Sequence, residues 1–117
     1  MQVPEANDWL STFGVAPEEV WASEPWMQSI TLTPGSEEAL TLSWHEYEGS
    51  LRLVWQQKDS VRVDVHRDGV QNLRIEDRRG AGTFVLFDYD SDGMVGTGAV
   101  QVWPSFGLAD ALRYDHR

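Results

Sequence analysis

Apolar and polar residues alternate along most of the chain after Ser29. Several short segments place an apolar side chain at every second position, a period typical of a strand with one buried face. These segments are residues 30–32, 40–44, 51–55, 61–65, 73–75 and 95–103. Residues 83–89 are more continuously apolar, which indicates a strand that is buried on both faces.

Turn-forming residues separate these segments, at intervals near the roughly 8–12 residues typical of all-β domains. The turn signals lie at residues 49–50, 58–59, 68–69, 80–82 and 90–93. The pattern predicts a mainly β fold, an antiparallel meander of about six or seven strands arranged as a sandwich or an open barrel. The β body is predicted to span residues 28–103.

The two ends of the chain carry helix signals instead. Residues 1–27 are predicted to form two short helical pieces that cover the sheet. The first piece ends at Gly14, and the second begins at Pro17, where the missing N–H of proline costs nothing. After the last predicted strand, Ser105 can cap a short helix, followed by a tail, within residues 104–117.

Side-chain parity makes two register predictions. A two-residue glycine–serine turn would place Trp44 opposite Trp55, as an aromatic cross-strand pair on one face. A hairpin at residues 68–69 needs a bulged turn with an odd number of loop residues, because only that loop puts Val63 on the same face as Leu73.

The composition is that of a single globular domain, residues 1–117, with 41% hydrophobic and 24% charged residues. The absence of cysteine excludes disulfides, thiolate metal sites and a cysteine nucleophile. No apolar run approaches the roughly 20 residues that a membrane-spanning helix needs. The amino terminus lacks the basic and apolar regions of a signal peptide, so we expect a cytoplasmic protein.

The charge is strongly asymmetric along the chain. The formal net charge is −10, from 19 acidic and 9 basic residues, and no lysine or arginine precedes Arg52. Such a field repels phosphate backbones and anionic membranes and attracts basic protein surfaces. The sequence therefore argues against direct binding to nucleic acid or membranes. The simpler alternative is that the charge only keeps the protein soluble.

Tryptophan is abundant, with 6 residues in the chain. Aromatic side chains beside carboxylates suit a protein-binding patch, because tryptophan is enriched among interface hot spots. The alternative is that these rings merely cover one face of the sheet. We expect the carboxylates of the basic-free segment to lie together on one side of the folded body. The predicted partner-binding residues are Glu18, Glu19, Trp21, Glu24, Trp26, Glu37, Glu38, Glu46 and Glu48.

The sharpest local motif lies at residues 88–93, where Asp88, Asp90 and Asp92 precede a glycine as in the first half of a calcium loop. Ala99 stands where such a loop needs a bidentate glutamate, so any calcium site is expected to be weak. The alternative interpretation is an acidic hairpin turn. The nearby glycines do not match a phosphate-binding loop and more simply allow a bulge or a close approach.

Histidines offer one further possibility for chemistry. His45, His66 and Asp64 are predicted on polar strand faces, where two imidazoles and a carboxylate can form a metal site or serve a hydrolase. Surface imidazoles are the simpler explanation, and no nucleophile motif supports catalysis. We therefore assign no catalytic residues.

Size, charge and aromatics favour a non-enzymatic protein-binding domain. The most concrete hypothesis is an intracellular bacterial antitoxin of the immunity-protein kind, an inhibitor that presents carboxylates to the basic cleft of a partner such as a nuclease toxin. The alternative is an extracellular β-module that binds calcium through its aspartates or carbohydrate through exposed tryptophans.

Overall fold

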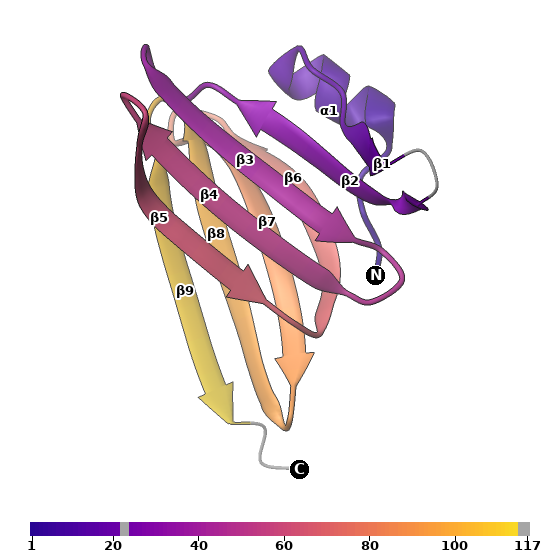
Figure 1. The fold of residues 1–117 in the computed structure, drawn as a ribbon. Helices are drawn as coiled ribbons and strands as arrows, with labels where there is room; N and C mark the ends of the chain where they lie inside the picture. Colours follow the sequence, from indigo (N-terminus) through magenta and orange to yellow (C-terminus); the bar gives the residue numbers. More distant parts are fainter. Residues whose placement is uncertain (22–23, 115–117) are drawn as a thin grey trace.

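The computed structural model describes residues 1–21 and 24–114 of the chain. It contains one short helix and two antiparallel sheets, of five and four strands, in the described residues. In Figure 1 the first sheet lies in front of the second. The elements are α1 (Ala6–Phe13), β1 (Glu18–Trp21), β2 (Glu24–Leu32), β3 (Glu38–His45), β4 (Ser50–Gln57), β5 (Ser60–Arg67), β6 (Val70–Arg78), β7 (Gly82–Ser91), β8 (Met94–Trp103) and β9 (Gly107–Tyr114).

Both sheets follow the chain without a crossover, in the orders β1-β2-β3-β4-β5 and β6-β7-β8-β9. This confirms the predicted antiparallel meander, although the described residues form more strands than the pattern predicted. The inward faces of both sheets supply one hydrophobic core, so the molecule is a two-layer sandwich. No helix in the described part of the chain has the length and apolar character that crossing a membrane requires.

The first predicted helix is confirmed and ends at Gly14, which adopts the left-handed conformation with φ 78°. Its Trp9 is fully buried and stacks on Trp44 of β3, with ring centroids 5.4 Å apart and an interplanar angle of 15°. Trp55 of β4 stacks in the same way on Phe106, at 4.3 Å and 10°. These three tryptophans therefore build the interior rather than a binding patch.

The two other predicted helices are wrong. The segment after Pro17 is strand β1, which pairs with β2, and the segment after Ser105 is strand β9, which pairs with β8. Helix-start signals such as an early proline and a capping serine are weak preferences. Strand pairing with a neighbour overrides them, since it satisfies backbone groups and buries apolar side chains.

The predicted register between β3 and β4 is also wrong, although the predicted faces are right. Trp44 lies opposite Leu51, and Trp55 lies opposite Leu40. The connection is a four-residue loop at residues 46–49 rather than a two-residue turn. Because the register differs from the predicted one by an even number of residues, every side chain keeps its face.

The predicted hairpin at residues 68–69 does not form, because β5 and β6 belong to different sheets. Leu73 is buried and Val63 is half-buried against the same core, so they face each other across the interior. Alternation of apolar residues shows which face is buried. It cannot distinguish a partner in the same sheet from a partner in the opposite sheet.

Candidate interaction surface at one end of the sandwich

Three connections between strands meet at one end of the sandwich, along the lower right of Figure 1. The backbone N–H of Val70 donates to Gly49 O at 2.8 Å, which ties the β5–β6 connection to the β3–β4 loop. The N–H of Asp90 donates to Gly69 O at 2.8 Å, which ties the same connection to the end of β7. We call this surface the loop end; it consists of residues 46–49, 68–69 and 90–93.

Local backbone geometry explains why these segments fit together. Gly69 has φ +68°, and a Cβ at this position would lie 2.1 Å from Asp90 O, so only glycine allows the two segments to approach so closely. Asp92 and Gly93 have φ 55° and 77° and form a two-residue turn between β7 and β8. Positive φ at both positions is the geometry favoured in two-residue hairpins.

The loop end is rich in carboxylates. Its acidic residues are Glu46, Glu48, Asp68, Asp90 and Asp92. Among these five, only Asp68 has a basic side chain at ion-pair distance within the described residues, His66 at 3.8 Å. Elsewhere, five carboxylates pair with basic residues from Arg52 onward. These pairs are Asp64–Arg52, Glu37–Lys58, Asp110–Arg67, Asp88–Arg74 and Glu76–Arg78.

Aromatic residues border these carboxylates. Tyr47 is 90% exposed at the tip of the β3–β4 loop, and Trp26 on β2 is 42% exposed. The N–H of Glu46 donates to Trp26 O at 3.0 Å, which holds the loop beside the strand. His45 is only 9% exposed, and its Nδ1 accepts the backbone N–H of Glu48 at 3.0 Å. A neutral His45 therefore carries its proton on Nε2, for which the described part of the chain provides no acceptor.

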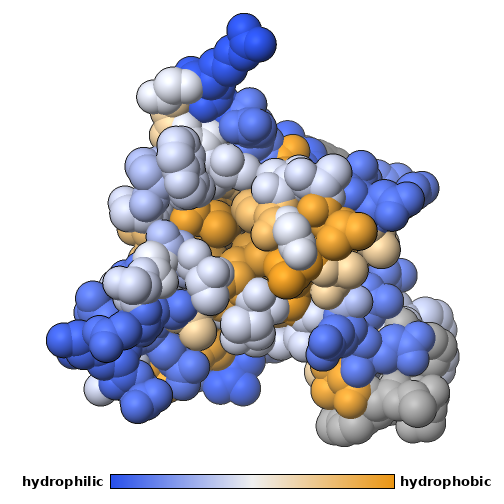
Figure 2. Space-filling view, turned by 90° about the horizontal axis from the view of Figure 1, so that it is seen from above, coloured by the Kyte–Doolittle hydropathy of each residue, from blue (hydrophilic) through white to orange (hydrophobic). Residues whose placement is uncertain are grey.

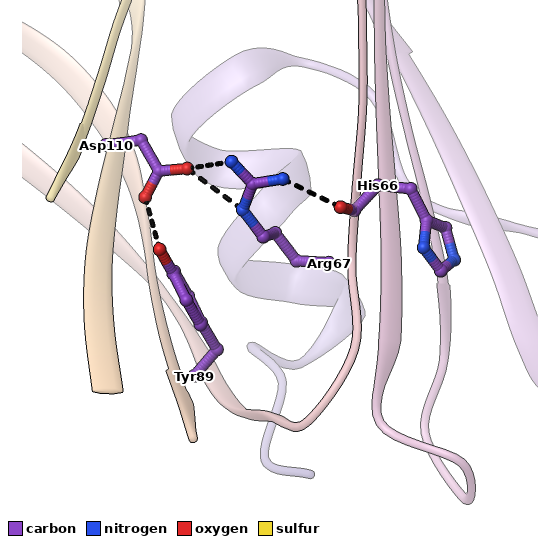
Figure 3. Close-up of polar contacts among 4 residues, drawn as sticks. All are labelled: His66, Arg67, Tyr89 and Asp110. Carbon is purple, nitrogen blue, oxygen red and sulfur yellow. Dashed lines mark hydrogen bonds and ion pairs between the residues drawn. The ribbon is translucent and has the colours of Figure 1, made fainter. Parts of the chain in front are cut away.

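A partly buried polar network supports the loop end (Figure 3). Arg67 reaches from β5 to Asp110 on β9, donating through Nε at 2.9 Å, while its other amino group donates to His66 O at 2.8 Å. The Tyr89 hydroxyl donates to the second oxygen of Asp110 at 2.7 Å. Burial and this hydrogen bond raise the pKa of Tyr89. Since Arg67 and Tyr89 immediately precede loop-end segments, the network fixes where those segments leave the sheets.

The predicted partner-binding residues are not gathered on one side. Glu46 and Glu48 lie in the loop end, whereas Glu37 and Glu38 lie at the opposite end of β3, roughly 23 Å away at the usual rise per residue. Glu37 is also 4.0 Å from Lys58. The expectation of a single acidic side is therefore wrong for this set as a whole.

The other members of that set lie along the first two strands. Glu18 and Glu19 are exposed on edge strand β1, and the exposed Trp26 lies beside the loop end. The side chains of Trp21 and Glu24 lie outside the part of the structure that is described.

Sequence reasoning singled out Asp90 and Asp92 as calcium ligands rather than as part of an interaction surface, and it did not assign Asp68 or Tyr47 to any site. A signal for them existed, since alternate turns of an antiparallel meander lie at the same end of the sheet. The first, third and fifth turn signals of the sequence are the three segments that meet here.

The predicted calcium residues lie on and after strand β7. Asp88 accepts hydrogen bonds from Arg74 at 3.0 Å and Thr97 at 2.9 Å, which link it to both neighbouring strands. Asp90 and Asp92 are exposed, and Asp92 occupies the hairpin turn. Among the described side chains, no three histidines, aspartates or glutamates are grouped in a way that could hold a metal ion. Calcium binding at this turn stays a prediction.

The structure does not bring His45, His66 and Asp64 together as a metal or hydrolase site. Asp64 forms a two-point contact with Arg52 at 3.0 and 2.7 Å, and this hydrogen bonding lowers the pKa of Asp64. His66 lies on the exposed face beside that pair, as expected for a surface imidazole. His45 was expected on a polar face and is instead buried under the β3–β4 loop.

The opposite end of the sandwich has a different character (Figure 2), with apolar residues at its centre and a hydrophilic rim. An open groove of about 420 Å³ lies there between α1 and the ends of both sheets. Trp103, which is 63% exposed, forms part of its wall. The groove is lined by Thr12, Phe13, Val15, Thr31, Leu32, Thr33, Thr83, Val102 and Trp103.

Comparison with known proteins shows a likeness in fold. No protein-family model and no curated protein sequence matches the chain. Among solved structures, a chain of a contact-dependent growth inhibition toxin–immunity protein complex from Klebsiella pneumoniae 342 superposes with a TM-score of 0.82. The match covers 96% of this chain and 96% of that chain, at 13% sequence identity. At this identity the likeness shows a common fold.

Proposed function

We propose that this protein is an immunity protein, which binds a toxin domain and blocks it without catalysing a reaction. The observation that carries the proposal is the full-length likeness in fold to a chain of a toxin–immunity protein complex. The charge of −10 favours the blocking role over the toxic one. A toxin that acts on nucleic acid must attract phosphates, whereas its inhibitor gains from carrying the same charge as they do.

The partner is a basic protein inside the bacterial cell, and the best candidate is a nuclease toxin. Carboxylates presented to its cleft occupy the place that substrate phosphates would take. Opposite charges on the two proteins accelerate association, and buried aromatic side chains supply most of the affinity. In this proposal the contacts come from one group of neighbouring carboxylates and from Trp26.

Co-expression tests the proposal. The toxin domain encoded by the neighbouring gene is expressed in a bacterial host with and without this protein, and growth is recorded. We expect growth arrest with the toxin alone and normal growth with both proteins. Purified together, they should form a stable complex with a dissociation constant of about a nanomolar or below. Growth arrest in both cases, or the absence of a toxin domain beside the gene, would contradict the proposal.

A titration separates blocking from catalysis. Toxin activity is measured at a fixed toxin concentration while this protein is added in increasing amounts. A binding inhibitor abolishes activity at one equivalent and leaves it partial below that. An enzyme that modified the toxin would abolish activity at a small fraction of an equivalent, given time, and that result would exclude the non-enzymatic role.

A further inference from the structure

The loop end is organised as a fixed surface before any partner arrives. Backbone hydrogen bonds of 2.8 Å at Gly49 O and Gly69 O join its three segments. The Arg67–Asp110–Tyr89 network holds the strands from which two of those segments emerge. A surface that is ordered in the free protein loses little conformational entropy on binding, and this favours affinity.

The loop end gathers several carboxylates without a cationic partner in one small area. Four of its carboxylates, those of Glu46, Glu48, Asp90 and Asp92, have no cationic partner within the described residues. Some carboxylates on the outer sheet faces are instead paired with arginines, as in Asp64–Arg52. Others outside the loop end, such as Glu18, Glu38 and Asp59, also have no ion pair among the described residues, but they are spread over several strands and turns. A cationic patch on a partner could pair with these carboxylates, and few ion pairs within this protein would have to break first.

Aromatic and polar groups at the loop end can contribute binding affinity in addition to the charge. Tyr47 exposes 90% of its surface, the largest exposure of any large hydrophobic side chain that is described, and Trp26 exposes 42%. Burial of such rings is what typically supplies hot-spot affinity at an interface. His45, at 9% exposure, holds an Nε2–H donor without an acceptor in the described residues. This donor is available to an acceptor on a partner.

We infer that the loop end is the surface that docks the toxin, with Tyr47 as its central anchor. The complementary surface on the toxin is an arginine- or lysine-rich patch. This inference rests on the proposed function and deepens it by assigning the surface. A second copy of this chain is a poorer occupant, because a symmetric contact would bring the same carboxylates together.

Two matched variants test the assignment in the complex with the toxin domain of the neighbouring gene. The loop-end variant carries Glu46→Gln, Glu48→Gln, Asp90→Asn and Asp92→Asn. The opposite-end variant carries Glu37→Gln, Glu38→Gln, Asp59→Asn and Asp77→Asn. Each raises the formal net charge from −10 by four, to −6. The two variants therefore share composition and total charge and differ in where the charge is lost, although Glu37→Gln also removes the exposed contact with Lys58.

We expect the loop-end variant to associate about tenfold more slowly, and its association rate to depend less on salt. The opposite-end variant should stay within about threefold of the unmodified protein, since charges more than a Debye length from the contact are screened. Thermal melts of both variants check that the fold is intact. An equal loss in both variants, or a larger loss in the opposite-end variant, would overturn the assignment.

Tyr47 gives an independent measurement that does not depend on charge. Tyr47→Ala should raise the dissociation rate at least about tenfold, whereas Tyr47→Phe, which keeps the ring, should stay near the unmodified protein. An unchanged dissociation rate in Tyr47→Ala would remove the anchor. A second result would also contradict this role of Tyr47. If the unmodified protein formed concentration-dependent dimers and Tyr47→Ala abolished them, the ring would serve self-association.

The two proposals fail in different ways. If the unmodified protein neither binds nor protects against the toxin, the proposed function is wrong. If it binds and the loop-end and Tyr47→Ala variants bind equally well, the function stands and the surface lies elsewhere.

Discussion

Arg67 in β5 forms an ion pair with Asp110 in β9, and this contact joins the two sheets of the sandwich at their adjoining edges. The residues are 43 positions apart in the chain. The side chains are 36% and 17% exposed, so the pair is partly shielded from water. Tyr89 adds a third group from the centre of the second sheet.

Asp110→Asn is expected to lower the free energy of unfolding by about 2 kcal/mol, because it leaves the Arg67 guanidinium half-buried without its counter-charge. Urea denaturation measures the loss. Asp64→Asn is the matched control, since it breaks a pair whose side chains are 58% and 44% exposed. The control should lose much less, because a solvent-exposed ion pair contributes little to stability. Equal losses in the two variants would show that Arg67–Asp110 is no more than a surface pair.

Tyr89 should make stability fall in alkaline solution. Its pKa is raised in the folded state, mainly by burial and then by the hydrogen bond to Asp110. The neutral phenol is therefore favoured in the folded protein, and its contribution is complete below the unfolded pKa of about 10. Above that pH the unfolded chain ionises first and stability declines. Thermal melts across this range should show a smaller decline in Tyr89→Phe than in the unmodified protein.

Asp64 should titrate below the usual range of aspartate. The hydrogen bond from Arg52 lowers its pKa, with a further contribution from the charge of the guanidinium. Carbon-detected NMR of the carboxyl group measures the titration directly. In Arg52→Gln the pKa should return toward the ordinary value of about 3.9. A pKa that is the same in both proteins would show that the contact does not persist in solution.

Gly98 on β8 should not tolerate any side chain. A Cβ at this position would lie 2.0 Å from the ring of Phe87, its cross-strand partner on β7. Gly98→Ala is expected to lose about 1–3 kcal/mol of stability through overpacking. The double variant with Phe87→Leu should recover part of the loss, because a smaller neighbour relieves the clash. Strictly additive losses would argue against a direct contact.

Most strands could be predicted from the sequence because a buried face imposes a period of two, as in β3 and β4, where alternate apolar residues are buried. The pairing register between neighbouring strands was harder to predict from the sequence. Trp44 has Leu51 as its partner rather than Trp55, because an even shift leaves the buried face unchanged and only the loop length decides. Strands β1 and β9 were missed because their pairing with β2 and β8 outweighs local helix signals.

The loop end was predicted only in part, for a reason of geometry. Reasoning from charge along the chain grouped Glu37 with Glu46, although a full strand separates them. Reasoning from the meander would have grouped Glu46 with Asp68 and Asp90, because alternate turns share an end. Tyr47 gave no pattern at all, since a single ring in a loop has no periodicity. Tyr47 is exposed because it lies in a four-residue loop, and the length of that loop is known only once the strand register is known.

Each sheet is formed by one uninterrupted stretch of chain, with every strand paired to its neighbour in sequence. Such short loop closures favour rapid folding, and the first sheet can complete its pairing during synthesis before the second sheet exists. The amino terminus behaves differently, since Gln2 exchanges backbone hydrogen bonds with Gln71 and Leu73 at 2.9 and 2.8 Å. Gln2 is synthesised long before β6 and can dock only once β6 has formed, so this contact closes the sandwich late.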